Sequence, residues 1–245
     1  MFFNKAARPR VVALQKRTIW PTRMSPPPVR SYGRIKARPL KPSQERALAS
    51  LAHRFALPGG PLAPEALFPD SKARVLEIGF GAGEHLLTRA AAQPDWGFLG
   101  VEPFLNGMAS CLRDLEGAGL GNVRVHRGDA REVMGRCADG SFACVYMLFP
   151  DPWPKTRHWK RRLVQRESLA EIARVLIPGG EFRFATDWAD YAAWTLALVQ
   201  RAPEFEWLAE RAADWREPWP GHAPTRYQQK QLGDCDPIWL RARRL

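Results

Sequence analysis

The sequence is poor in residues that form disulfides or bind metals. Its four cysteines include no Cys-x-x-Cys pair, and its five histidines are scattered along 245 residues. A disulfide-stapled fold and a cysteine–histidine metal cluster are therefore excluded, and we expect no metal. Isolated thiols are typical of a reducing compartment, which predicts a cytoplasmic protein.

Long apolar runs are also missing. The longest, at 142–149, has the length of a strand, and no run approaches the roughly 18 residues that a membrane-spanning helix needs. The sequence therefore predicts no membrane insertion. A hydrophobic content of 45% still allows a sizeable core, as in an ordinary globular enzyme or binding protein.

Acidic residues are absent from the first 42 positions, which hold eleven of the 37 Lys and Arg residues. The rest of the chain has 26 basic and 25 acidic residues, so the net charge of +12 belongs mostly to this arm. Three interpretations remain open: contact with a polyanion such as nucleic acid, a mitochondrial-type presequence, or translation that starts at Met24. Residues 1–31, rich in Pro and Arg, are expected to be disordered, and residues 32–245 to form a single domain.

From about residue 72, short apolar runs alternate with helical stretches. This order predicts an α/β fold, an open, mostly parallel, Rossmann-like sheet with helices on both faces, ending in an antiparallel C-terminal edge. The helix before Pro178-Gly179-Gly180 is expected to stop there. We expect strands at 73–78, 97–101, 123–127, 143–149, 181–185 and 238–245, and helices at 84–92, 105–116, 131–136, 163–176 and 189–201.

A glycine-rich turn follows the first strand. Gly79, Gly81 and Gly83 lie at the carboxyl end of that strand, where glycines let the backbone approach a ligand closely. The dinucleotide fingerprint requires another glycine where this chain has Glu84. Glu77, just before the turn, would repel a pyrophosphate but suits a ligand with an ammonium and a sulfonium group. A nicotinamide oxidoreductase is therefore disfavoured.

Acidic residues also end the next two strands. Glu102, 23 residues after Gly79, is placed to accept both hydroxyls of a ribose. Asp129, followed by Ala130, is placed to accept a hydrogen bond from an adenine amine. Each acid alone is an ordinary strand-end residue, but the three acids together with the glycine turn indicate a nucleoside-type cofactor. The pattern is similar to that of the class I methyltransferases, which use S-adenosyl-L-methionine. The predicted cofactor-binding residues are Glu77, Gly79, Gly81, Gly83, Glu102, Asp129 and Ala130.

The most specific segment follows the fourth strand, at 149–162. Asp151 stands between two prolines that restrict the backbone, and an aromatic residue and five cations follow. A carboxylate backed by aromatic and basic residues suits a guanine within an RNA strand, since the acid accepts from the base, the ring stacks and the cations hold phosphates. A solvated basic loop is the alternative interpretation.

This segment resembles that of the bacterial tRNA (guanine-N7)-methyltransferases. Their pattern PDPWxKxRHxKRR is present from Pro150 to Arg162, and their ATDxxxYA element from Ala185 to Ala192. The resemblance covers roughly residues 32–245 and implies a tRNA substrate. It also implies that Asp151 lines the cofactor site and that Lys155 and Asp187 contact the substrate. The RNA contacts that it implies are Arg157, His158, Lys160, Arg161 and Arg162.

One element departs from the family pattern. Where relatives carry Thr-x-x-Glu, this chain has Thr225 and Gln228, both expected to bind substrate. The carbonyl of Gln228 is expected to accept a hydrogen bond from the guanine amine, without the strength that a charge gives.

The resemblance implies a reaction that transfers a methyl group to N7 of a guanine in the tRNA variable loop, giving 7-methylguanosine and S-adenosylhomocysteine. Because N7 carries a lone pair and no proton, we expect positioning and electrostatics rather than a general base, with Asp151 as the catalytic residue. Asp187 is expected to help orient a guanine that is flipped out of its tRNA contacts. Another methyltransferase substrate and a non-catalytic tRNA-binding module remain alternatives. A monomer or homodimer is expected.

Overall fold

The computed structural model describes residues 32, 33 and 39–245 of the chain. The predictions for the arm at 1–31, including its disorder and its RNA contacts, lie outside these residues.

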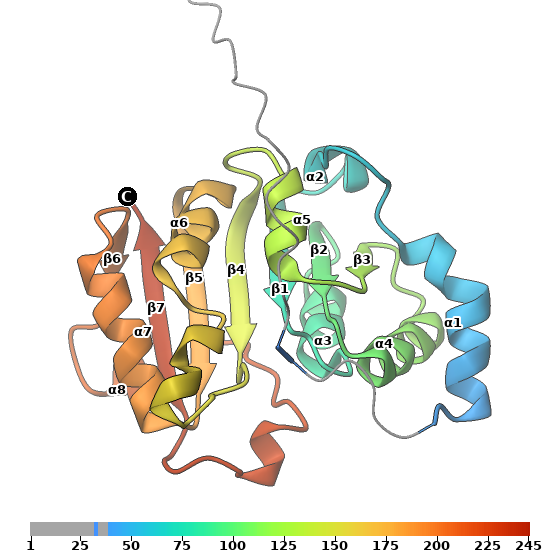
Figure 1. Ribbon diagram of the computed structural model, residues 1–245. Coiled ribbons are helices and arrows are strands. Elements are labelled where there is room, and N and C mark those ends of the chain that lie inside the picture. Colours follow the sequence, from blue (N-terminus) through green and yellow to red (C-terminus); the bar gives the residue numbers. More distant parts are fainter. Residues whose placement is uncertain (1–31, 34–38) are drawn as a thin grey trace, which may run out of the picture.

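Seven strands form one twisted sheet in the order β3-β2-β1-β4-β5-β7-β6 (Figure 1). The first five strands in the chain are parallel, and β7 pairs antiparallel with both β5 and β6. The central strands β1, β4 and β5 are mostly apolar because helices cover both faces of the sheet. The strands are β1 (Ala73–Ile78), β2 (Trp96–Val101), β3 (Val123–His126), β4 (Phe142–Leu148), β5 (Leu176–Thr186), β6 (Phe205–Trp207) and β7 (Ile238–Arg244).

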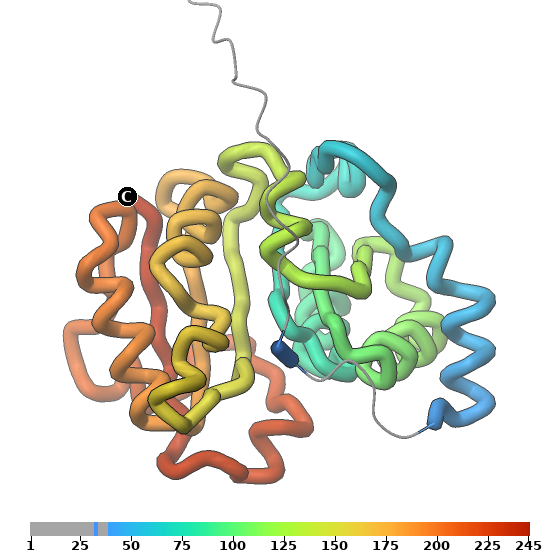
Figure 2. Tube along the Cα trace, in the orientation of Figure 1, coloured from blue at the N-terminus to red at the C-terminus, as the bar shows by residue number. Residues whose placement is uncertain are grey.

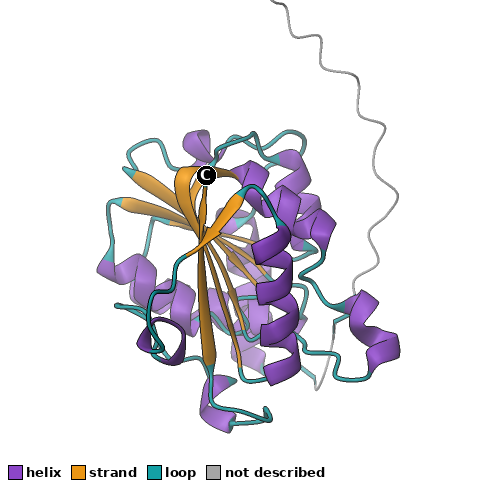
Figure 3. Cartoon of the chain, turned by 90° about the vertical axis from the view of Figure 1, so that its left-hand side faces the viewer, coloured by secondary structure: helices purple, strands orange, loops and turns teal. Residues whose placement is uncertain are grey.

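Helices pack on the two faces of the sheet and enclose two apolar clusters (Figure 3). Helices α5, α6 and α7 cover one face, and α1, α3 and α4 cover the other. Amphipathic patterning explains the packing, since α3, α4 and α6 each bury an apolar stripe toward the sheet, while α1 packs mainly on α4. The helices are α1 (Pro42–Phe55), α2 (Pro64–Leu67), α3 (Glu84–Ala92), α4 (Leu105–Ala118), α5 (Ala130–Arg136), α6 (Arg166–Val175), α7 (Ala189–Arg201), α8 (Ala213–Arg216) and the 3₁₀ turns η1 (Thr156–Arg161) and η2 (Gln228–Lys230).

The predicted fold class is confirmed, and strand β1 and helices α3 and α7 have the predicted bounds. The glycine pair before Glu181 lies within β5, where the pairing with β4 shifts register, rather than between the helix and the strand. Strand β7 is antiparallel as predicted, and the unpredicted β6 lies outside it at the edge. Helix α1 was also not predicted; its buried Gln44 donates to the Ser110 hydroxyl of α4 at 2.8 Å.

The carboxyl ends of the parallel strands all open at one edge of the sheet. The segment between α8 and β7, coloured red-orange in Figure 2, passes across this edge. Three functional stretches of the sequence therefore meet there: the glycine turn, the loop after β4 and the segment at 217–237.

Candidate functional site

The glycine turn after β1 has the backbone that its sequence predicts. Gly79, Gly81 and Gly83 have φ angles of 76°, 60° and 90°, a region that favours glycine. Helix α4 lies close against the turn, because a β-carbon on Gly107 would fall 2.4 Å from the carbonyl oxygen of Gly81. Gly83 is the N-cap of α3, and a β-carbon there would fall 2.7 Å from the sulfur of Cys111. At Gly79 and Gly81, by contrast, a β-carbon would meet no atom within 4 Å, so the backbone at the end of β1 is accessible to a ligand.

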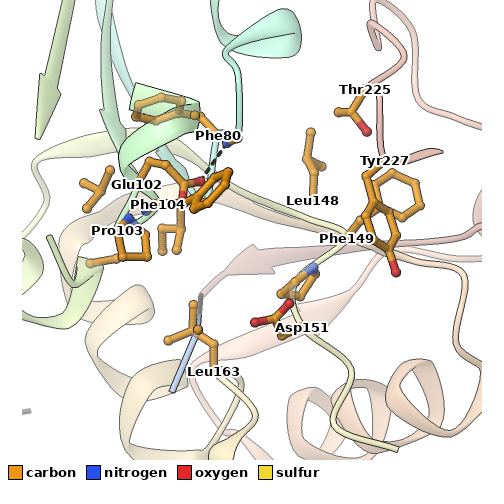
Figure 4. Close-up of a pocket in the computed structure, with 18 of the residues that line it drawn as sticks. Phe80, Glu102, Pro103, Phe104, Leu148, Phe149, Asp151, Leu163, Thr225 and Tyr227 are labelled. Carbon is orange, nitrogen blue, oxygen red and sulfur yellow. Dashed lines mark hydrogen bonds between the residues drawn. The ribbon is translucent and has the colours of Figure 1, made fainter. Parts of the chain in front are cut away.

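A cavity of about 1200 Å³ lies at this edge of the sheet (Figure 4). In Figure 4, Glu102 and Phe104 line one side, Thr225 and Tyr227 the other, and Asp151 projects between them. The volume exceeds the roughly 300–1,000 Å³ that is usual for a single small ligand, so it leaves room for two. Of the predicted cofactor-binding residues, all but Gly83 line it: Glu77, Gly79, Gly81, Glu102, Asp129, Ala130 and Asp151.

Glu102 is held at the end of β2 by two backbone hydrogen bonds. Its carboxylate accepts from the Gly81 N–H at 2.7 Å and from the Phe104 N–H at 2.8 Å. Burial raises the pKa of Glu102 to about 7, although the two backbone donors favour the ionised form. The side chain thus joins the glycine turn to α4 and presents a carboxyl group to the cavity.

Asp129 is the N-cap of α5 and pairs with a neighbouring cation. It accepts from the Arg131 backbone N–H at 2.9 Å, and its carboxylate lies 2.7 Å from the Arg131 guanidinium. Both residues line the cavity. The predicted adenine contact would therefore be made by a carboxylate already oriented by an arginine.

Glu77 forms a buried pair that the sequence did not predict. Its Oε2 lies 2.7 Å from Nδ1 of His85 on α3, and the side chains are only 3% and 1% exposed. No local pattern predicts this pair, because the two residues lie eight positions apart on different elements. The pair fixes the carboxylate of Glu77 beneath the cavity.

The turn that carries Asp151 has a strained backbone. Phe149 and Trp153, on either side of the Pro-Asp-Pro sequence, have φ angles of 48° and 44°, which non-glycine residues rarely adopt. Two hydrogen bonds hold the turn: the Phe149 N–H donates to the Ala185 carbonyl at 2.7 Å, and Arg162 Nε donates to the Pro152 carbonyl at 2.9 Å. Such strain costs about 1–3 kcal/mol per residue and is concentrated at functional sites.

The basic residues after this turn divide into surface and interior groups. Lys155, Arg157 and Lys160 are exposed on and beside η1, while His158 is half-buried. Arg161 lines the cavity and lies 5.2 Å from the Trp153 ring. These positions leave the four cations available to a polyanion.

Arg162 does not fit its predicted role as an RNA contact. Its side chain is 0% exposed and pairs with Asp190 of α7 at 2.6 Å. The rings of Trp159, Tyr191 and Trp194 surround its guanidinium at 4.7, 4.7 and 5.6 Å. The prediction was wrong because neighbouring residues at the end of a 3₁₀ turn point in different directions, and this one points into the protein.

The predicted substrate-binding residues are not all brought together. Asp187 and Gln228 line a second cavity of about 650 Å³, whereas Thr225 lines the first one and Lys155 lines neither. The dividing segment, residues 224–232, contributes side chains to both cavities and so lies between them.

Asp187 is unusual in the second cavity. It is 4% exposed, and no side chain donates to its carboxylate oxygens, although the backbone N–H groups of Asp187 and Gly233 lie near enough to favour the ionised form. Burial raises the pKa of this carboxyl group above its ordinary value. A buried carboxylate that has only backbone donors nearby keeps free acceptor positions, so Asp187 suits a ligand that donates hydrogen bonds.

No group of His, Cys, Asp and Glu able to hold a metal ion occurs among residues 32–33 and 39–245. Within the same residues, no helix has the length and apolar character needed to cross a membrane.

Comparisons with known proteins agree on one family. A family model described as "Putative methyltransferase" matches residues 71–239. A tRNA (guanine-N(7)-)-methyltransferase of Caulobacter sp. (strain K31) is 50% identical over 213 residues, which cover 87% of this chain and 94% of that protein. One from Nitrobacter hamburgensis is 50% identical over 204 residues, covering 81% of this chain and 80% of its own length.

Solved structures share the fold at low identity. The 16S rRNA methyltransferase KamB matches with a TM-score of 0.53 at 16% identity, covering 74% of this chain and 91% of its own. An antibiotic-related methyltransferase matches with a TM-score of 0.51 at 15% identity, covering 76% and 96%. At these identities the likeness concerns the fold alone.

Proposed function

The chain belongs to the tRNA (guanine-N(7)-)-methyltransferase family, and we propose that the first cavity binds the methyl donor and that the acceptor guanine turns N7 toward this cavity and its pairing edge toward the second. The protein is an enzyme that methylates N7 of a guanine in tRNA. The proposal concerns the residues that do so, the donor S-adenosyl-L-methionine, and an acceptor guanine in the variable loop. The cytoplasmic location and the monomer or homodimer stay predictions.

The first cavity has the chemistry that S-adenosyl-L-methionine requires. This group supplies a methyl on a positively charged sulfur. Glu102 offers a carboxylate for the ribose hydroxyls, Asp129 an acceptor for the adenine amine, and Glu77 a negative charge for the ammonium end. The turn at Gly79 and Gly81 leaves room for the ligand, since β-carbons there would meet no atom within 4 Å.

The acceptor base needs orientation rather than deprotonation, because N7 carries a lone pair. We place Asp151 beside the reacting atoms, where its carboxylate stabilises the positive charge that develops on the guanine ring. Asp187 accepts hydrogen bonds from the base, while Lys155, Arg157, Lys160 and Arg161 hold phosphates. Thr225 supports this arrangement indirectly, since its hydroxyl accepts from the Gln228 N–H at 3.1 Å.

One observation carries this proposal: the strained turn of Asp151 opens into the same cavity as the carboxyl group of Glu102. The two acids follow strands β2 and β4, which lie on either side of β1, and they face a common space large enough for two ligands (Figure 4).

The test is transfer of a labelled methyl group from S-adenosyl-L-methionine to unmodified tRNA transcripts, followed by nucleoside analysis. We expect 7-methylguanosine, and we expect it to vanish when the acceptor guanine of the variable loop is replaced. Label in a different nucleoside would overturn the substrate assignment. Binding of cofactor and tRNA without transfer would overturn the catalytic assignment.

Cofactor binding is expected to depend on pH through Glu102. Because burial raises its pKa to about 7, the carboxyl group is protonated below that pH and loses its ability to accept two ribose hydroxyls. The Kd of S-adenosyl-L-methionine is expected to rise about tenfold between pH 8 and pH 6, as measured by calorimetry. Glu102→Gln should bind S-adenosyl-L-methionine weakly, with a Kd that does not change between pH 8 and pH 6. A wild-type Kd that does not change over this range would contradict the role of Glu102 in binding the ribose.

A further inference from the structure

We propose that His222 is a positioning residue that fixes the amide of Gln228 with its NH₂ group toward the second cavity, where it donates a hydrogen bond to O6 of the acceptor guanine. This inference rests on the proposed function. It also replaces the prediction that the Gln228 carbonyl accepts from the guanine amine.

The contact between the two side chains defines the orientation of the amide. Nε2 of His222 lies 2.9 Å from Oε1 of Gln228. An amide oxygen only accepts hydrogen bonds, so the imidazole nitrogen must donate. With its carbonyl turned toward His222, the side chain of Gln228 presents its NH₂ group on the other side, and this residue lines the second cavity.

The protonation state of His222 agrees with this assignment. Burial lowers the pKa of the imidazole, so it is neutral at neutral pH and carries a single N–H. Nδ1 is buried and has no partner. A proton on Nδ1 would leave a buried donor unpaired, whereas a proton on Nε2 is used by Gln228.

The imidazole ring is held rigidly in an aromatic cluster. The ring of Trp239 lies 4.5 Å away, and those of His85 and Trp219 lie 5.4 and 5.9 Å away. Since His85 is itself fixed by Glu77, the cluster extends from the first cavity to the second. A ring packed in this way holds the amide of Gln228 in one orientation.

The resulting cavity matches the pairing edge of guanine. Asp187 offers two acceptor oxygens that no other side chain uses, and Gln228 offers a donor. Guanine presents two donors, N1–H and the 2-amino group, beside one acceptor, O6. A glutamate at position 228 would supply a further acceptor instead of a donor, so it could not form this hydrogen bond to O6.

The experiment compares tRNA transcripts that carry guanosine or 6-thioguanosine at the acceptor position, since sulfur is a poor hydrogen-bond acceptor. For the wild-type protein we expect kcat/KM to be roughly fivefold lower with the thio base, the effect of one neutral hydrogen bond. The ratio of kcat/KM with guanosine to kcat/KM with 6-thioguanosine should fall to about one in Gln228→Leu. It should fall equally in His222→Phe, which keeps an aromatic ring. Gln229→Leu is the matched control, because Gln229 lines the same cavity and should keep the wild-type ratio.

A ratio near five in all variants would overturn the role of Gln228, and a ratio near five in His222→Phe alone would overturn the role of His222. If His222→Phe does not fold, the Gln228→Leu ratio still decides the donor assignment. Absence of transfer to guanosine by the wild-type protein would instead refute the proposed function.

Discussion

Replacement of Asp151 with Ala is expected to lower kcat for methyl transfer by about 10²–10³-fold, which is the usual effect of removing one electrostatic group at a reacting centre. The positive charge moves onto the guanine ring during the reaction, and Asp151 lines the first cavity, toward which we propose that N7 points. The turn that holds it is strained at Phe149 and Trp153, so the carboxylate is positioned before the substrate binds. Single-turnover rates at saturating tRNA and cofactor measure this effect.

Two further variants separate charge from position. Asp151→Asn keeps the size and polarity of the side chain and removes its charge, so it should lose most of the same activity. Asp70→Ala removes an exposed acid outside both cavities and should have wild-type rates. The Kd of the cofactor should stay within about one order of magnitude in all three variants. An Asp151→Ala protein with an unchanged rate would refute the catalytic role of this residue.

Replacement of Arg162 with Met is expected to lower the free energy of unfolding by about 3 kcal/mol, the lower end of the effect of breaking a buried ion pair. Its partner Asp190 has a side chain 36% exposed and regains water, which limits the loss. The substitution also leaves the Pro152 carbonyl without its donor, so the Asp151 turn should loosen and kcat should fall. Urea denaturation and single-turnover kinetics measure the two effects.

Arg161→Met is the matched control. Arg161 is only half-buried and lines the cavity, so its replacement should leave stability within about 0.5 kcal/mol. Instead it should weaken tRNA binding and reduce the slope of log K against log salt by about one, as expected for one lost phosphate contact. A reduced salt slope with unchanged stability in Arg162→Met would return that residue to the RNA-binding set.

The residues of the site that lie at strand ends could be predicted from local sequence alone. Glu77, Glu102 and Asp129 lie at or within three residues of the ends of β1, β2 and β3, and parallel strands bring such positions to one edge of the sheet. The glycine turn was equally predictable, since it requires φ angles that other residues rarely adopt.

Long-range packing explains what the sequence did not reveal. Arg161 and Arg162 look alike in the chain, and only α7, through Asp190 and Tyr191, draws the second one inside. His85 and His222 are separated by 137 positions, so no periodicity relates them. Asp187 was predicted to lie near the other substrate residues, but the dividing segment places it in a separate cavity from Thr225.

Strand β7 has a consequence for the order of events during synthesis. It follows every other described element along the chain, yet it is inserted between β5 and β6 and carries Trp239 against His222. Chains emerge from the ribosome with their N-terminal parts first, so β5 and β6 are translated before β7, the strand with which both of them pair. A nascent chain that ends before Ile238 therefore contains the glycine turn and the Asp151 turn but lacks the support beneath the second cavity. In such a chain the ring of His222 lacks its contact with Trp239, so the packing that orients Gln228 is complete only after β7 has been translated.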